Sequence, residues 1–332
     1  MSIEVLPDAR GHTGRKCPSD GCSPGYFKVK TGTGITQGQT TAYCPYCRAS
    51  GEPSEFFTEA QVQYVKDVAM REVAQGVSRM FENALGLGPS RRRKVGGGLV
   101  SVELSYKPGT LPPVSRPIEE ELRRDVVCPN CTLEHAVFGL AVWCADCGAD
   151  IFMTHVTTEC ASLSAGLSDV ERRRQLLGGR VAARDVENAL EDNVSVFEAT
   201  LGFVMRRSLE GKGRAPDQVN ELFDKTVRNA FQSVERASAI YRDHLAINIL
   251  GSLSKEEQDL LRVTFEKRHP ITHNLGLVDR RYLRKVRSGE LQGRDVRVTA
   301  DDVSRAIELT TRVLGNVYKQ AFPTPASVQG AP

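Results

Sequence analysis

Residues 128–147 have the sequence CPNCTLEHAVFGLAVWCADC, in which two Cys-x2-Cys pairs lie 12 residues apart. A second set of cysteines occupies residues 17–47, where a Cys-x4-Cys pair is followed after 21 residues by a Cys-x2-Cys pair. Eight of the nine cysteines thus fall into four close pairs, and only Cys160 stands apart. In a reducing compartment, such pairs indicate metal ligands rather than disulfides.

The spacing within each pair predicts a tight turn that points both thiolates at one position, about 2.3 Å from a metal. Both clusters resemble zinc ribbons. Four cysteines fill a tetrahedral shell, which favours structural zinc over a catalytic site that keeps one position open. We therefore expect two structural zinc ions per chain and no catalytic metal. The expected ligands are Cys17, Cys22, Cys44 and Cys47 for one ion, and Cys128, Cys131, Cys144 and Cys147 for the other.

Some questions about these clusters stay open at the level of sequence. His135 lies four residues after Cys131 and is an alternative ligand, although four cysteines already complete the shell. Zinc can replace a hydrophobic core that is too small to fold alone. The ribbons can also present a surface to nucleic acid or protein. The spacing does not show whether the two ribbons are independent or packed as one unit.

The pattern of Pro, Gly and apolar residues divides the rest of the chain into segments. Pro53 opens a helical stretch with apolar residues every three or four positions, and a Gly-Pro segment at 86–89 ends it. A basic, glycine-rich connector follows, and alternation over residues 99–106 predicts a strand. The expected segments are zinc ribbon 1 at 1–52, a helix with a basic linker at 53–95, a strand with zinc ribbon 2 at 96–160, a helical bundle at 165–322 and a disordered tail at 323–332.

Long apolar stripes at helical spacing dominate after residue 165. One stripe runs from Val186 to Val204, and a second runs from Val219 to Leu245 behind Pro216 at a first helical position. Each stripe predicts one continuous helix of roughly 28 to 33 residues, a length that suits an up-and-down bundle.

Two capping boxes add further helices to the bundle. Ser254 with Glu257 predicts the start of a helix that ends near His269, and Thr299 with Asp302 predicts the start of the final helix. The expected fold is therefore mainly α, with a C-terminal up-and-down helical bundle and small β zinc-ribbon modules in the N-terminal half.

Positive charge is concentrated in one segment of the bundle. The chain as a whole has a net charge of +3, but residues 267–297 contain nine Lys or Arg against three acids. A local basic field of this kind attracts polyanions such as RNA. The alternative interpretation of the same charges is a solvated helix face.

The sequence Arg268-His269-Pro270-Ile271-Thr272-His273 lies inside this basic segment and is followed by NLGLVDRRYL at 274–283. An Arg-x4-His pair is expected about 0.6 times by chance in a chain of this composition, so the spacing alone is weak evidence. With its context, the stretch resembles the HEPN superfamily of small helical bundles. Nucleolytic members of that family carry Arg, a polar residue, three variable residues and His between long helices. The resemblance covers roughly residues 165–322.

The resemblance implies metal-independent cleavage of RNA by its own 2′-hydroxyl, which leaves a cyclic phosphate and a free 5′-hydroxyl. His273 is the expected acid/base residue, because histidine titrates near neutral pH. Arg268 is expected to hold the phosphate through its fixed positive charge. His269, the polar residue of the motif, is expected to orient the site or the RNA.

The family also implies partners. Its active cleft usually forms between two such domains, so we expect a homodimer that binds RNA, with a protein or ribonucleoprotein as a possible trigger. Family nucleases often act as toxins or antiviral defence effectors, which makes such a role a hypothesis for this chain. Five basic residues would extend the groove along the RNA: Arg280, Arg281, Arg284, Lys285 and Arg287.

A non-catalytic alternative remains. Arg268 and His273 can mark an ordinary helix end, where cations interact favourably with the C-terminal dipole. The chain would then be a zinc-ribbon scaffold or a nucleic-acid-binding protein whose bundle only dimerises, with both side chains buried and paired. Cys160 is expected to be a small buried residue. Without a secretory signal or an apolar stretch of roughly 20 residues, the expectation is a cytoplasmic protein with no membrane partner.

Overall fold

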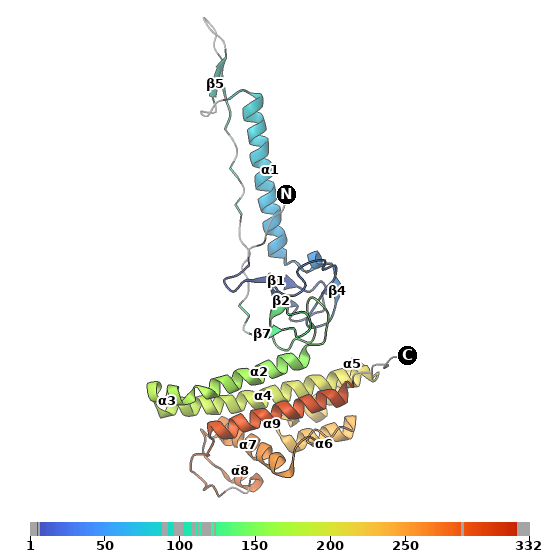
Figure 1. The fold of residues 1–332 in the computed structure, drawn as a ribbon, viewed down its shortest axis with the longest axis vertical. Coiled ribbons are helices and arrows are strands. Elements are labelled where there is room, and N and C mark those ends of the chain that lie inside the picture. Colours follow the sequence, from blue (N-terminus) through green and yellow to red (C-terminus); the bar gives the residue numbers. More distant parts are fainter. Residues whose placement is uncertain are drawn as a thin grey trace, which may run out of the picture. The chain divides into compact units, whose positions relative to one another are not determined.

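The structure is a computed structural model of the chain (Figure 1). It describes residues 5, 7–87, 92–95, 102–107, 110–111, 113–114, 121–122, 124–286 and 289–323. Within these ranges the protein is mainly helical with a small antiparallel sheet in the N-terminal half, which confirms the predicted fold class. The chain separates into two compact units, Met1–Phe152 and Met153–Pro332. None of the described helices is long and apolar enough to cross a membrane.

Both cysteine clusters belong to one four-stranded sheet. Its central pair joins a strand of the first cluster to a strand of the second, with Phe27 opposite Val137 and Val29 opposite His135. The two ribbons are therefore packed as one unit. The strands follow the order β1 (His12–Lys16), β2 (Tyr26–Lys30), β8 (Glu134–Val137) and β7 (Arg124–Val127), all antiparallel, and β3 (Ala42–Tyr43) pairs separately with β4 (Ser50–Gly51).

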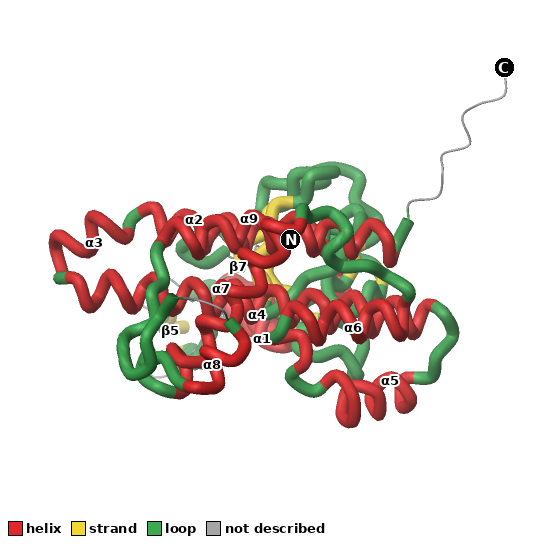
Figure 2. The backbone as a smooth tube through the Cα atoms, turned by 90° about the horizontal axis from the view of Figure 1, so that it is seen from below, coloured by secondary structure: helices red, strands yellow, loops and turns green. Residues whose placement is uncertain are grey.

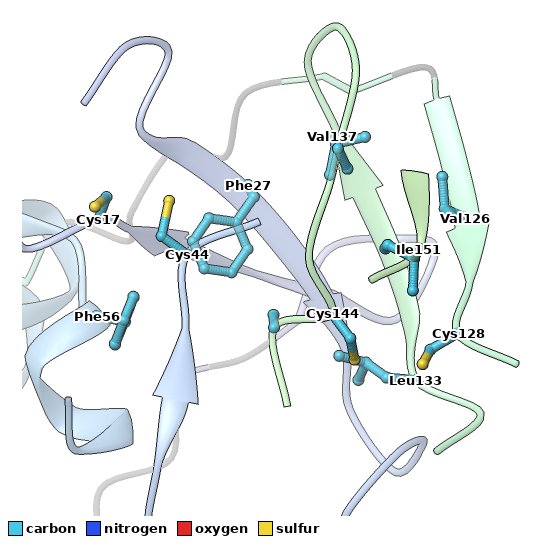
Figure 3. Packing of buried hydrophobic residues seen from close by; sticks show 12 residues of the cluster. Cys17, Phe27, Cys44, Phe56, Val126, Cys128, Leu133, Val137, Cys144 and Ile151 are labelled. Carbon is cyan, nitrogen blue, oxygen red and sulfur yellow. The ribbon is translucent and has the colours of Figure 1, made fainter. Parts of the chain in front are cut away.

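A cluster of buried apolar residues packs the sheet and both cysteine groups of this unit (Figure 3). Phe27 from β2 is only 1% exposed and makes an edge-to-face contact with Phe56, with ring centroids 6.1 Å apart. Leu133 of the second cluster lies against Gly34 of the first, where an added Cβ would come within 2.9 Å of the leucine side chain. Because four of the buried residues are cysteines from both clusters, the metal sites and the core are built from the same side chains.

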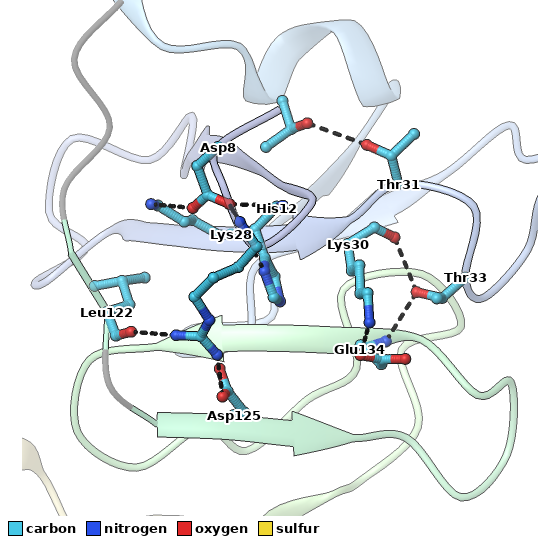
Figure 4. A network of polar contacts seen from close by, with 11 residues as sticks. Asp8, His12, Lys28, Lys30, Thr31, Thr33, Leu122, Asp125 and Glu134 are labelled. Atoms are coloured by element: carbon cyan, nitrogen blue, oxygen red, sulfur yellow. Dashed lines mark hydrogen bonds and ion pairs between the residues drawn. The ribbon is translucent and has the colours of Figure 1, made fainter. Parts of the chain in front are cut away.

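Charged side chains also link the strands and their flanking segments in this unit (Figure 4). The ammonium group of Lys28, which is almost fully buried, donates to Asp8 at 2.7 Å. Lys30 on β2 pairs with Glu134 on β8 at 2.6 Å, and Arg10 pairs with Asp125 on β7. Each of the last two ion pairs links the first cysteine cluster to the second.

The predicted helix after the first cluster starts later than expected. Pro53–Phe56 forms a separate 3-10 turn (η1), and α1 (Glu59–Ala84) begins behind Thr58, whose hydroxyl accepts the N–H of Gln61 in a capping box. A hairpin follows, with β5 (Arg92–Val95) antiparallel to β6 (Val102–Ser105). The predicted strand at 99–106 thus overlaps β6, and its first three residues lie outside the described part of the chain.

The second unit is helical (Figures 1 and 2). The first apolar stripe forms one continuous helix, α4 (Gly179–Gly211), as predicted. This helix packs along α9 (Ala300–Ala321) and contacts α7 (Lys255–His273). Both predicted capping boxes are present, at Ser254 for α7 and at Thr299 for α9. The helices outside the second stripe are α2 (Phe152–Ser168), α3 (Val170–Leu177), α4 (Gly179–Gly211), α7 (Lys255–His273), α8 (Arg280–Lys285) and α9 (Ala300–Ala321).

The prediction of one continuous helix for the second stripe was wrong. The stripe is broken into α5 (Pro216–Leu222), a π-helical turn η2 (Phe223–Val227), a 3-10 turn η3 (Ala230–Gln232) and α6 (Val234–Leu245). The break centres on Arg228, whose φ of 44° and ψ of −115° end the helical path. Ser233 then adopts an extended conformation as the N-cap of α6. The apolar spacing survives the break, because Ala230, Phe231 and Val234 are still buried.

The end of α7 also differs from the prediction. The helix continues past His269 to His273, with the buried Pro270 inside it. Asn274 and Gly276 both donate backbone N–H groups to the Pro270 carbonyl, at 2.9 and 2.8 Å, and so close the helix end. The predicted tail beyond Pro323 lies outside the described residues.

Candidate functional site

The eight predicted metal ligands form two groups of four. In each group the four Sγ atoms lie within 4.8 Å of one another, so each group can hold a metal ion. A tetrahedron of sulfurs about 2.3 Å from a central ion has edges of about 3.8 Å. The observed Sγ–Sγ distances come close to this value. They are 3.6 Å for Cys17–Cys47, 3.6 Å for Cys22–Cys44, 3.7 Å for Cys128–Cys147 and 3.4 Å for Cys131–Cys144.

Three of the four cysteine pairs adopt the same turn. The N–H of the first cysteine donates to the carbonyl five residues later, at 2.8 Å in the pairs 44–47 and 144–147 and at 2.9 Å in the pair 128–131. The residue after the second cysteine then has a left-handed φ of 64° or 65°; these residues are Arg48, Thr132 and Gly148. This turn brings both thiolates to one side of the backbone, as the Cys-x2-Cys spacing predicts.

Two of these turns pack against each other reciprocally. The ring of Tyr43 lies against Gly148, where an added Cβ would come within 3.0 Å of it. In the matching position, the Arg48 guanidinium lies over the ring of Trp143, 4.1 Å from the centroid. The backbones of the two turns are also hydrogen-bonded reciprocally. The N–H of Tyr43 donates to the Ala145 carbonyl at 2.8 Å, and the N–H of Trp143 donates to the Pro45 carbonyl at 3.1 Å. The two clusters are therefore related by a local pseudo-twofold arrangement.

His135 is excluded as a fifth ligand by its hydrogen bonds. It is fully buried, and its Nε2 accepts the backbone N–H of Ala145 at 2.9 Å. Its Nδ1 lies 3.2 Å from the Val126 carbonyl, to which it donates in the tautomer that leaves Nε2 as acceptor. Both ring nitrogens are thus used within the core, and the residue joins β7 and β8 to the second cluster.

A second candidate site lies at the end of α7 in the helical unit. Arg268, His269 and His273 line one pocket of about 240 Å³, and the two imidazole rings have centroids 5.1 Å apart. The remaining lining residues come from η3, α6, α7 and α8 or lie next to them. They are Asn229, Gln232, Ser233, Arg236, Phe265, Glu266, Arg281 and Lys285.

The pocket is strongly basic. Four of its lining residues are Arg or Lys, and the one acid, Glu266, is paired with Lys285 at 2.7 Å. Of the predicted RNA-binding residues, Arg281 and Lys285 belong to the lining. Arg280 and Arg284 are exposed on α8 outside it, and Arg287 lies outside the described residues.

The histidines occupy different environments. His273 is the last residue of α7 and is exposed, whereas His269 is half-buried with its Nε2 3.8 Å from the Asp279 carboxylate. Burial and the nearby Arg281 lower the pKa of His269 below its usual value, although Asp279 opposes the shift. The Tyr282 N–H bond lowers the pKa of Asp279, so this carboxylate stays charged. The lowered pKa favours the neutral form of His269 at physiological pH.

Arg268 is half-buried and is not paired with an acid among the described residues. Its Nη1 donates to Gln232 at 3.0 Å, and Gln232 donates in turn to the carboxylate of Glu198 at 3.0 and 3.3 Å. Gln232 and Arg236 also line this pocket, and nothing in the sequence indicated them. They lie more than 30 residues before the motif, and no spacing rule connects them to it.

Comparison with known protein families, with characterised proteins and with solved structures finds no match for this chain.

Proposed function

We propose that the chain is a metal-independent endoribonuclease of the HEPN type, with its active site in the basic pocket at the end of α7. One observation carries the proposal: Arg268 and His273 line the same pocket, together with three further cations and a single acid that is already paired. The non-catalytic alternative expects both side chains to be buried and paired, whereas His273 is exposed and Arg268 contacts a neutral amide.

The pocket chemistry suits cleavage by the RNA's own 2′-hydroxyl. His273 takes the proton of that hydroxyl, whose oxygen then bonds to phosphorus while the bond to the 5′-oxygen breaks. The 5′-oxygen receives a proton, and the phosphate becomes a 2′,3′-cyclic ester. Arg268 stabilises the charge that develops on the phosphate oxygens, and Arg281 and Lys285 hold the neighbouring backbone. A homodimer would supply a second His273 as the proton donor.

We assign the two cysteine groups to structural zinc. Four thiolates at tetrahedral spacing favour zinc or an iron–sulfur centre, and zinc is the usual ion of closed four-cysteine sites with knuckle turns. Burial raises the pKa of Cys22 and of Cys131 to about 11, so binding of a cation there displaces protons. The zinc-bound unit would recognise the RNA or a protein or ribonucleoprotein trigger, in line with a regulated toxin or antiviral role.

The test is cleavage of a 5′-labelled RNA by the purified full-length protein, with EDTA present and zinc content measured afterwards. We expect Arg268→Ala and His273→Ala each to reduce the rate by about 10²-fold or more. Matched controls are Arg262→Ala and His244→Ala, which remove the same residue types from the same unit outside the pocket lining. Equal rates in all five proteins would refute the assignment, and wild-type protein that binds RNA without cutting it would favour the scaffold.

A further inference from the structure

The guanidinium of Arg268 is held by an amide rather than by an acid. The Nη1 group donates to Oε1 of Gln232 at 3.0 Å, and this is its one hydrogen bond to another described residue. Its Nε is shielded from solvent without an acceptor among the described residues. A buried N–H group without an acceptor is destabilising. The guanidinium therefore keeps donor groups that no described residue accepts.

Glu198 fixes which way the Gln232 amide faces. An ionised carboxylate only accepts hydrogen bonds, so the group that lies 3.0 and 3.3 Å from its two oxygens must be the NH2 of Gln232. The amide oxygen then has to face Arg268. Three separate elements meet in this chain of bonds, because Glu198 lies on α4, Gln232 ends η3 and Arg268 lies on α7.

The bonds preserve the charge of the arginine. A carboxylate at the position of Gln232 would form an ion pair with Arg268 and compete with a phosphate for it. The neutral amide orients the guanidinium without neutralising it, and the negative charge of Glu198 is separated from it by the length of that amide. On the same two helices, Phe197 of α4 and Phe265 of α7 make an edge-to-face contact, with ring centroids 5.1 Å apart.

The break in the second apolar stripe places Gln232 at the pocket. Arg228 has φ 44° and ψ −115°, a conformation that is unfavourable for a non-glycine residue. The turn that follows is anchored by Phe231, which is 2% exposed and packs 5.7 Å from the ring of Tyr241. π-Helical turns such as η2 are often found at functional sites.

We propose that Gln232, oriented by Glu198, is a positioning residue that presents Arg268 to the scissile phosphate without reducing its charge. This inference rests on the proposed ribonuclease function. A misplacement of about 1 Å at a reacting group can lower the rate by about 10²-fold. Gln232→Leu should therefore lower kcat by about 10²-fold, with a much smaller change in KM.

Three further variants distinguish positioning of Arg268 from a purely structural role of Gln232. Glu198→Leu should lower kcat as much as Gln232→Leu does. Glu198→Gln keeps an acceptor for the Gln232 amide, so its kcat should be close to that of wild type. Gln232→Glu places two carboxylates side by side and raises the pKa of one of them. Its rate relative to wild type should rise as the pH falls, because protonation restores a neutral acceptor. The matched control is Gln258→Leu, a half-buried glutamine of α7 whose amide bonds backbone carbonyls outside the pocket lining.

The arginine can also be followed without any activity. In ¹⁵N-arginine-labelled protein, restricted rotation of the Arg268 guanidinium should give separate signals for its two Nη groups. The Arg268→Lys variant lacks these signals and so assigns them. In Gln232→Leu the guanidinium should rotate freely, and the two signals should merge into one. If wild type is inactive but the signals merge in the variant, positioning stands and the ribonuclease assignment falls. If wild type cleaves RNA and Gln232→Leu matches it in rate and signals, the positioning role is overturned while the nuclease stands.

Discussion

Loss of one cysteine should weaken the metal site to which that cysteine does not belong. We take Cys147→Ser, which removes a ligand of the second group only. Because β2 and β8 form the centre of one sheet, a disordered second cluster would leave the first without its partner strand and without part of its core. We expect both sites to lose affinity together rather than one at a time.

The size of this effect follows from the shared contacts. Three backbone hydrogen bonds outside the sheet join the clusters, each with a net value of about 1 kcal/mol. Phe27 and Leu133, 1% and 2% exposed, pack across the boundary and contribute at least about 1.5 kcal/mol each. The total of about 6 kcal/mol corresponds to roughly four orders of magnitude in the zinc affinity of the intact site.

The assay is competition with a coloured chelator, which reports how many zinc ions are released and at what chelator concentration. Wild type should release two ions in one transition, and Cys147→Ser should retain neither at a chelator concentration that leaves wild type loaded. Cys160→Ala, which removes a buried thiol outside both groups, controls for loss of a cysteine as such. A Cys147→Ser protein that keeps one ion with wild-type affinity would refute the coupling.

Other predictions concern the helical unit. Phe197→Ala should reduce the free energy of unfolding by about 3–5 kcal/mol, because it leaves a cavity in the core. The control Leu176→Ala, at a site that is 67% exposed, should change this free energy by less than about 0.5 kcal/mol. Urea denaturation measures both values. Tyr241→Phe removes a buried hydroxyl that donates to a backbone carbonyl at 2.5 Å and should cost about 1 kcal/mol in the same experiment. An NMR titration should give His269 a pKa below 6.5, which Arg281→Gln raises. The unfolded state binds more protons in that range, so stability should decrease as the pH falls through about 6.5, and a pKa above 6.5 would contradict the argument.

The metal sites could be predicted from sequence because their chemistry is local. A Cys-x2-Cys pair needs only one turn to aim both thiolates, and the capping boxes at Ser254 and Thr299 are equally short-range. The union of the two ribbons in one sheet could not be predicted in this way. It depends on the pairing of Phe27 with Val137, and no local signal indicates which strand will cover the edge of β2.

The helix break shows a different limit. Apolar spacing from Val219 to Leu245 continues through Arg228 as if one helix were present, because the buried side of the segment stays buried after the chain turns. Asn229 and Ser233 are residue types that favour helix caps and turns, and they were the features of the sequence that indicated a break in the helix. The candidate site depends on this break, since it brings Gln232 at the end of η3 to Arg268 on α7, a residue distant from it in sequence.

α2 was missed for a compositional reason. The segment from Phe152 to Ser168 contains several Thr, Ser and Gly residues, which have weak helix propensity. Tertiary burial outweighs that weakness, because Val156 and Cys160 are almost fully buried. Cys160 is thus the small core residue that the sequence analysis expected.

The pairing of β2 with β8 has a consequence for folding during synthesis. Phe27 and Val137 are 110 positions apart, so the contact order of this sheet is high. β2 therefore cannot form its pairing with β8 until β8 has been synthesised. At about 5–20 residues per second, a ribosome needs roughly 5–20 s to make that length of chain. Throughout this interval β2 is an open strand edge, able to pair with other chains. Because the first cysteine group is expected to bind zinc weakly without β8, metal binding would close this edge only once the partner strand has emerged.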